Sequence, residues 1–169
     1  MSGDGNPPAA VQPAAALPGS PGSGTIEAGE HCLPIRVYYE DTDAAGIVYH
    51  ASYLRFAERA RTEFLRHAGI GQRDLAGSDG VAFAVRHASL DYRWPAQLDD
   101  RLEVRSRLAR LGAASVEIGQ RVLRERQTLV TIMVKVACVS LSSGRPQRLP
   151  AAVRDALKPY AQQETGESA

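Results

Sequence analysis

The sequence predicts an α+β fold in which a curved, antiparallel, five-stranded sheet wraps around one long helix. Two observations predict this class: a long apolar pattern with helical period, and four long segments after it with the period of two that is typical of strands. One strand is expected before the helix, so the order does not show the βαβ alternation of a parallel sheet. A sheet of this length curls, and one helix fits into its concave face.

The long helix is expected over residues 50–68. Apolar residues recur there on one stripe, and the small side chains on that stripe allow a sheet to approach closely. Gly69 follows the last apolar residue and predicts the end of the helix. The stripe consists of Tyr53, Ala57, Ala60, Phe64 and Ala68.

The strands are expected where apolar and polar residues alternate. The first covers residues 35–39, and the other four lie at residues 81–92, 101–109, 116–122 and 130–138. Turns are expected at residues 111–114 and 124–127. A short terminal helix is expected at residues 150–160, with Pro150 at its start.

The N-terminal segment differs in composition from the rest of the chain. Residues 1–24 hold five of the ten prolines, and Asp4 is their only charged residue. Such a segment cannot bury enough apolar surface to offset the entropy of ordering it. We therefore expect residues 1–30 to be a disordered tail, residues 31–160 to be one domain, and residues 161–169 to be a frayed C-terminus.

Charge and cysteine content exclude several classes of protein. With 20 basic and 19 acidic residues the net charge is +1, which does not indicate a nucleic-acid partner. Residues 31–160 alone carry all 20 basic and 14 acidic residues and are mildly basic. No apolar run predicts a membrane span, and the N-terminus lacks the pattern of a secretory signal. Cys32 and Cys138 do not suggest a disulfide framework, so a reducing, cytoplasmic location is expected.

Residues suited to catalysis are concentrated in the loop between the first strand and the helix. Asp41 and Asp43 lie two positions apart, Gly46 permits a tight turn, and His50 stands at the expected start of the helix. Free N–H groups there can receive developing negative charge. A carboxylate facing them can act as a base or a nucleophile on an activated acyl carbon. The spacing alone also fits helix capping, so both interpretations stay open at this point.

Residues 36–63, RVYYEDTDAAGIVYHASYLRFAERARTE, resemble the signature of hot-dog-fold acyl-CoA thioesterases of the 4-hydroxybenzoyl-CoA thioesterase superfamily. Within it, they are most similar to the Tol–Pal system-associated acyl-CoA thioesterases of Gram-negative bacteria. The resemblance extends more weakly through residues 81–86 and 92–102 and covers about residues 34–155. The long N-terminal tail departs from the short start that is usual in this family.

The resemblance implies a hot-dog fold whose subunits pair edge to edge into dimers, often two per tetramer, with active sites at the dimer interface. It implies that Asp43 is the catalytic carboxylate. It also implies that the backbone amide of His50 polarises the thioester carbonyl, while the imidazole is a further candidate group. Asp41 is expected to hold the loop. The expected substrate-binding residues are Gly46, Val48, Tyr49 and Glu58, although an outward ion pair is the alternative for Glu58.

The expected reaction is hydrolysis of an acyl-CoA to a free acid and CoA, with Asp43 as general base or nucleophile and with no cofactor or metal. Acyl carrier protein is a further candidate partner, and the chain is expected to form a homodimer or homotetramer. One alternative is a non-catalytic hot-dog protein that binds acyl carriers or docks on an envelope complex. Another is a hot-dog hydratase, whose His/Asp arrangement is absent here. The seven arginines in residues 101–126 fit either a solvated strand face or a seat for CoA phosphates.

Overall fold

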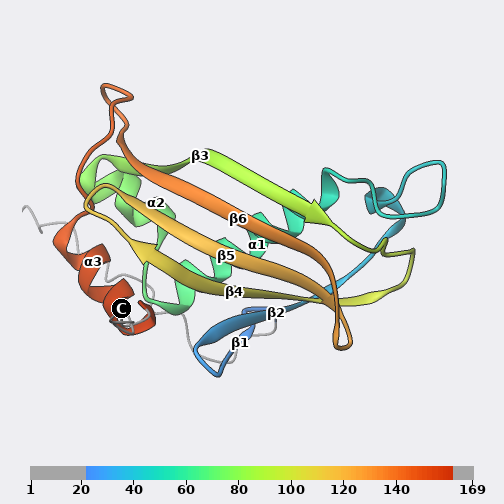
Figure 1. Cartoon of the computed structure of the whole chain (residues 1–169). Helices are drawn as coiled ribbons and strands as arrows, with labels where there is room; N and C mark the ends of the chain where they lie inside the picture. Colours follow the sequence, from blue (N-terminus) through green and yellow to red (C-terminus); the bar gives the residue numbers. More distant parts are fainter. Residues whose placement is uncertain (1–21, 162–169) are drawn as a thin grey trace, which may run out of the picture.

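The structure is a computed structural model that describes residues 22–161. Within this range six strands form one antiparallel sheet in the order β1-β2-β4-β5-β6-β3, and α1 lies against one face (Figure 1). The strands are β1 (Thr25–Glu27), β2 (Glu30–Arg36), β3 (Val81–Tyr92), β4 (Arg101–Leu111), β5 (Ser115–Arg124) and β6 (Gln127–Ser140). The helices are α1 (Ser52–His67), α2 (Gln72–Asp74) and α3 (Ala151–Leu157), with single turns η1 (Tyr39–Asp41), η2 (Leu75–Asp79) and η3 (Lys158–Tyr160).

This architecture is the predicted hot-dog fold, with one long helix held by a curved antiparallel sheet. The expected stripe of α1 is its buried face, and Tyr53, Ala57, Ala60 and Phe64 are all at most 2% exposed. Because two of these residues are alanines, α1 packs closely on β2, β4 and β5. The sheet curls because its register shifts at three places, near residues 85–87, 108–110 and 122–123.

The first strand differs from the prediction, which placed it at residues 35–39. The strand β2 begins earlier, at Glu30, and ends at Arg36. The alternating pattern continues through the buried Val37, but Tyr38 and Tyr39 are exposed and the chain turns into η1. Pro34 lies within β2 opposite Glu103 of β4, beyond the part of β2 that β1 covers, so its missing N–H breaks no ladder bond on that side.

A short extra strand, β1, makes the sheet six-stranded and lies in the segment that the composition assigned to the tail. Thr25 pairs with Cys32, and Glu27 pairs with Glu30 across a tight turn that contains Ala28 and Gly29, both with positive φ. Residues 25–30 are therefore part of the sheet. The rest of the expected tail up to residue 21, and the C-terminus from residue 162, lie outside the described residues.

The helix α1 begins two residues later than expected, at Ser52 rather than at residue 50, and ends at His67. Its start is fixed by a tighter turn, in which the N–H of Ser52 donates to the carbonyl of Tyr49 at 2.8 Å. Gly69 has a φ of +80°, which explains why the helix stops where the sequence predicts. His50 thus precedes the helix rather than lying in its first turn.

Candidate active site

Asp41 holds together the loop that precedes α1. Its side chain is 2% exposed, and Oδ2 accepts a hydrogen bond from the N–H of Tyr38 at 3.0 Å. Its carbonyl oxygen accepts from the N–H of Tyr49 at 2.8 Å and from the hydroxyl of Ser52 at 3.1 Å. Asp41 therefore holds both ends of the loop through hydrogen bonds, which is the role expected for it.

Asp43 lies at the tip of the same loop, in a tight turn. Its N–H donates to the carbonyl of Ile47 at 2.9 Å, and its carbonyl accepts from the N–H of Gly46 at 3.0 Å. Gly46 has a φ of +74°, which glycine adopts without strain. The Asp43 Oδ1 accepts from the N–H of Ala45 at 2.8 Å. Oδ2 has no hydrogen-bond or ion-pair partner among residues 22–161, so the turn fixes one carboxylate oxygen and leaves the other unpaired.

His50 stands beside this loop, immediately before α1. Its carbonyl accepts a hydrogen bond from the hydroxyl of Tyr92 at 3.0 Å, which ties the start of the helix to the end of β3. Its imidazole packs on the ring of Tyr49 with centroids 4.3 Å apart. Within the described part of the chain, the N–H of His50 donates to no protein acceptor. This N–H is thus available to an oxygen atom of a ligand.

Asp43 and His50 line one pocket with a volume of about 400 Å³. Its floor is Val48, which is 3% exposed and whose N–H donates to the carbonyl of Ala96 at 2.8 Å. Its walls come from the loop before α1, from α1 itself, and from the end of β3 with the residues that follow it. They are formed by Ile47, Tyr53, Tyr92, Arg93, Trp94 and Pro95.

Two tyrosines hold this pocket in shape. The rings of Tyr53 and Tyr92 meet edge to face at 5.8 Å, and the hydroxyl of Tyr53 accepts from the N–H of Ala96 at 2.9 Å. Burial raises the pKa of Tyr92, and burial also raises the pKa of Tyr53 against the opposing effect of its bond to Ala96. Both hydroxyls therefore stay protonated, and neither can serve as a base near neutral pH.

The structure brings some of the expected site residues together and separates others. Asp43, Val48 and His50 share the pocket, and Gly46 forms the turn beside it. Tyr49 contacts His50 but does not line the pocket, and it is 46% exposed. The residues from β3 and its end were not expected in the site. Their only sequence signal was the weak match around residues 92–95.

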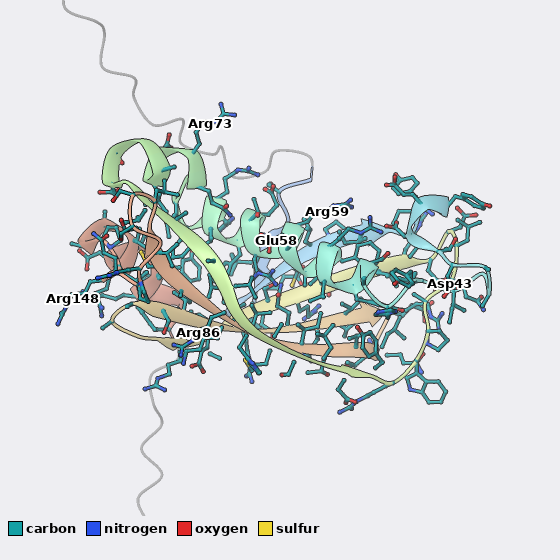
Figure 2. All side chains as sticks on the ribbon, turned by 90° about the horizontal axis from the view of Figure 1, so that it is seen from above. Asp43, Glu58, Arg59, Arg73, Arg86 and Arg148 are labelled. Carbon is teal, nitrogen blue, oxygen red and sulfur yellow. The ribbon has the colours of Figure 1, made fainter. Side chains whose placement is uncertain are left out.

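Glu58 lies in a different place, on the exposed side of α1. Figure 2 shows it on the helix, well separated from Asp43 at the tip of the loop. It forms an ion pair with Arg61 and lines a second, smaller pocket of about 40 Å³ between α1 and β3. The walls of that pocket are mostly apolar and comprise Leu65, Phe83, Val85, Val116, Ile118 and Val136, with Gln72 at its rim.

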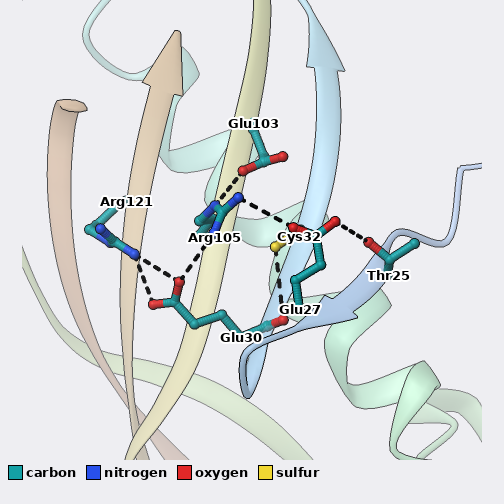
Figure 3. Close-up of polar contacts among 7 residues, drawn as sticks. All are labelled: Thr25, Glu27, Glu30, Cys32, Glu103, Arg105 and Arg121. Atoms are coloured by element: carbon teal, nitrogen blue, oxygen red, sulfur yellow. Dashed lines mark hydrogen bonds and ion pairs between the residues drawn. The ribbon is translucent and has the colours of Figure 1, made fainter. Parts of the chain in front are cut away.

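Several arginines of residues 101–126 are neutralised by carboxylates. Figure 3 shows Arg105 beside Glu103, Glu27 and Glu30, while Arg121 donates to both oxygens of Glu30 at 2.7 and 3.0 Å. These side chains lie on the face of the sheet opposite α1. A separate arginine, Arg124, pairs with Asp100 at 2.9 Å. These pairs favour the solvated strand face for Arg105 and Arg121 over a seat for phosphates.

The described residues offer no cysteine nucleophile and no metal site. Cys32 and Cys138 are buried, free thiols. Burial raises the pKa of Cys32 to about 11 and also raises that of Cys138, so both thiols stay protonated. Across residues 22–161, no group of three or more His, Cys, Asp or Glu side chains could hold a metal ion. None of the helices in that range is long and apolar enough to cross a membrane.

A hot-dog fold that places a loop carboxylate and an unpaired backbone N–H beside one pocket, just before the central helix, is compatible with the hydrolysis of thioesters. The comparison with protein families agrees, because the thioesterase-like superfamily matches residues 37–157. The chain therefore belongs to the thioesterase-like superfamily, which confirms the resemblance seen in residues 36–63.

Individual relatives support this assignment over nearly their whole length. The chain is 45% identical over 125 residues to the acyl-CoA thioesterase YbgC of Haemophilus influenzae, covering 74% of this chain and 92% of the relative. It is also 45% identical over 121 residues to the acyl-CoA thioester hydrolase YbgC of Escherichia coli O6:H1, covering 71% and 90%. The crystal structure of a probable thioesterase from Bartonella henselae is similar with a TM-score of 0.69 at 42% identity, covering 72% and 99%.

Proposed function

We propose that this protein hydrolyses acyl-CoA thioesters and that Asp43 is the catalytic carboxylate. The observation that carries the proposal is the shared pocket of Asp43 and His50: a residue whose carboxylate has an unpaired oxygen and a residue whose backbone N–H is unpaired line the same space. The names of the relatives supply the substrate class, since YbgC of H. influenzae and of E. coli are acyl-CoA thioester hydrolases.

In this proposal the thioester carbonyl oxygen accepts from the N–H of His50, which stabilises the negative charge that forms there. Tyr92 keeps the backbone at this point fixed through its bond to the His50 carbonyl. Val48 forms the floor under the acyl carbon, and Gly46 lets the loop bring Asp43 to it. The imidazole of His50 is a second candidate group, since it lines the same pocket.

Asp43 can act by two routes. As a base, it takes a proton from water, whose oxygen bonds to the acyl carbon; the C–S bond then breaks, and the thiolate of CoA leaves and is protonated. As a nucleophile, its oxygen bonds to the acyl carbon and expels the thiolate, and water then cleaves the mixed anhydride. Label found in the Asp43 carboxylate after a single turnover in ¹⁸O-labelled water would establish the second route, because the first route cannot place it there.

The substitution Asp43→Asn tests the proposal. Asparagine keeps the size of the side chain and can accept the bond from Ala45, but it can neither take up the proton nor attack the thioester. We expect kcat to fall by about 10² to 10⁴, the usual effect of removing a general base, with a nearly unchanged melting temperature. Thiol release from a series of acyl-CoA substrates measures the effect.

Asp41→Asn is the matched control, because Asp41 is fastened to the backbone of the loop rather than exposed to the pocket. It should lose much less activity than Asp43→Asn. If Asp43→Asn kept more than about a tenth of the turnover, the proposed mechanism would be wrong. If the unmodified protein bound acyl-CoA without releasing thiol, a non-catalytic acyl-carrier-binding role would replace the enzyme.

We further propose that the working unit is a dimer formed through β3. Among the described strands β3 pairs only with β6, so its other edge is open, and residues 84–87 are exposed. Antiparallel pairing of β3 with a second copy would bring two pockets close together. The smaller pocket, lined by Phe83 and Val85 of one subunit, would lie near Tyr92 in the wall of the other subunit's Asp43 pocket. Glu58 would then reach the acyl group across the interface, and Tyr49 would border the same entrance.

Acyl carrier protein is a second proposed source of substrate, because it presents the same kind of thioester. A cytoplasmic location is also proposed, and the two free cysteines support it.

A further inference from the structure

Arg61 is an unusual residue for the buried face of α1. Its side chain is 7% exposed, yet its only ion-pair partner within the described residues is Glu58, whose side chain is 54% exposed. A half-exposed partner offsets the desolvation of a buried guanidinium poorly, and apolar residues often replace such pairs without loss of stability. The stability of the fold therefore does not by itself explain an arginine at this position.

A chain of buried hydrogen bonds fixes the Arg61 guanidinium. Its Nη1 donates to the Oε1 of Gln120 at 2.7 Å. The Gln120 amide nitrogen donates to the carbonyl of Ala57 and to the hydroxyl of Ser106, both at 2.9 Å. Because the Ala57 carbonyl can only accept, the amide cannot be reversed, and its oxygen must face Arg61. Ser106 and Gln120 are at most 1% exposed, so β4 and β5 hold the guanidinium rigidly.

The other side of Arg61 borders the small pocket that Glu58 also lines. The pocket has apolar walls, and its volume of about 40 Å³ corresponds to roughly three water-sized groups. Such a pocket is large enough for the end of an apolar chain and too small for a thioester together with the CoA thiol. Arg61 lies eight residues after Tyr53 on α1, or about 12 Å along the helix from the wall of the Asp43 pocket.

We propose that Arg61 is a positioning residue: anchored by Gln120, it holds the Glu58 carboxylate at the rim of the pocket between α1 and β3, and so controls how the end of a long apolar acyl group is bound. This inference rests on the proposed thioesterase function. It assigns Arg61 to the binding of the acyl end and gives it no part in the chemistry at Asp43.

A double-mutant cycle tests the inference, with the substitutions Glu58→Gln and Arg61→Met alone and together. Methionine fills the space of the arginine stem and removes only the charged head group. If Arg61 acts through Glu58, each single variant and the double variant lose about the same factor, roughly tenfold in kcat/KM, and the loss appears mainly in KM. Losses that multiply in the double variant, to about a hundredfold, overturn the inference.

Acetyl-CoA serves as the control substrate, because its acyl group is too short to reach the pocket. Arg61→Met should impair hydrolysis of longer acyl-CoA esters and leave acetyl-CoA unaffected; an equal loss for both, or a lower melting temperature without any change in KM, overturns the inference. Arg59→Met is the matched variant, since Arg59 is exposed on the same helix and points away from the sheet (Figure 2). It should behave as wild type.

Arg61→Lys keeps the inference testable if Arg61→Met does not fold. Lysine retains the charge but lacks the planar fork that reaches Gln120 and Glu58 together, so it should show a smaller rise in KM for longer acyl groups. Wild-type KM values for Arg61→Lys overturn the inference. Asp43→Asn separates the test of this inference from the test of the proposed thioesterase function. If Asp43→Asn abolishes thiol release for every acyl length, the thioesterase function stands. If the Arg61 variants then do not discriminate among acyl lengths, only the positioning role of Arg61 is wrong.

Discussion

His31 shows how a single buried side chain can link the N-terminal segment to the core. Its imidazole is fully buried and stacks on Phe64 with centroids 5.9 Å apart. Nε2 bonds to the carbonyl of Ser23 at 2.8 Å, which makes Nε2 the protonated nitrogen of the neutral ring. Nδ1 is buried and has no partner in the described structure. A second proton on this ring would therefore lack an acceptor.

This geometry predicts that the protein loses stability in mild acid. Burial lowers the pKa of His31 below its ordinary value of 6.5, and the nearby His67 lowers it further, against the opposing effects of the bond to Ser23 and of Glu63. The unfolded chain thus binds the proton more readily than the folded chain, so stability is complete above about pH 6.5 and falls as the pH is lowered. Melting temperatures between about pH 7.5 and pH 5 measure the loss.

His31→Phe should reduce this dependence on pH, because phenylalanine keeps the stacked ring and cannot be protonated. His67→Gln provides the comparison: it removes one neighbouring charge but leaves the burial of His31, the largest cause of the lowered pKa, in place. It should retain most of the dependence. If His31→Phe loses as much stability in acid as the unmodified protein, another group is responsible.

At the level of residues, the sequence could predict that Asp43 and His50 lie close together, because they belong to one continuous motif and flank one short loop. It could not predict Tyr92 or Trp94 as pocket walls, since these residues reach the loop only through the pairing of β3 with β6 and the bond from Tyr92 to His50. Glu58 lies on the expected helix, but the burial of the nearby Arg61 depends on its hydrogen bond to Gln120 of β5. No local pattern contains that contact.

Among the elements, those with a long, regular period were predictable and those set by tertiary contacts were not. The strand β3 spans the expected residues 81–92, and β4, β5 and β6 each contain their predicted ranges. The first strand was misplaced because the segment His31–Pro34 lacks a clear alternation, and pairing with β4 decides its structure instead. The strand β1 has only three residues and is held by the turn at Gly29 and by the ion pair of Glu27 with Arg105.

The N-terminal segment gives a prediction at this scale. A deletion of residues 1–21 keeps every described element, whereas a deletion of residues 1–28 removes β1, the Ser23 carbonyl on His31 and the Glu27 ion pair. We expect the longer deletion to lower the melting temperature relative to the shorter one. The two truncated proteins serve as a matched pair in thermal unfolding.

Both deletions should leave kcat unchanged. His31 lies near His67 at the end of α1, and Asp43 precedes the other end of this 16-residue helix, about 24 Å away along its axis. Equal melting temperatures would show that β1 adds nothing to the fold. A loss of turnover confined to the longer deletion would show that this hairpin supports the pocket.

For the whole molecule, the arrangement of the sheet decides which surface is left unpartnered. The helix α1 packs on β2, β4 and β5, while the inner face of β3 is only partly covered, and Val85 is 52% exposed. An open edge beside exposed apolar residues favours aggregation unless a partner covers it. Symmetric pairing of two copies through β3 would cover both the open strand edge and the exposed apolar residues. It would also place the two Asp43 pockets on either side of one interface.

The last prediction concerns this pairing. Arg86 and His87 lie at the centre of β3, so a symmetric antiparallel pair of the whole strand places His87 of each copy opposite Arg86 of the other. His87→Arg would then set two like charges opposite each other at both positions, and like charges across paired strands weaken the pairing. We expect the unmodified protein to be a dimer or tetramer at micromolar concentration, and His87→Arg to shift toward monomer with a parallel loss of activity. Light scattering and thiol release on the same samples measure both.

Gln127→Arg is the control, because residue 127 lies beside the turn between β5 and β6, and the substitution adds the same charge away from the edge strand. Its mass and activity should match the unmodified protein. Activity that rises with protein concentration in the His87→Arg variant would tie turnover to assembly, as expected if Glu58 reaches the acyl group across the interface. A fully active monomer would instead mean that the pocket of Asp43 and His50 is complete within one chain.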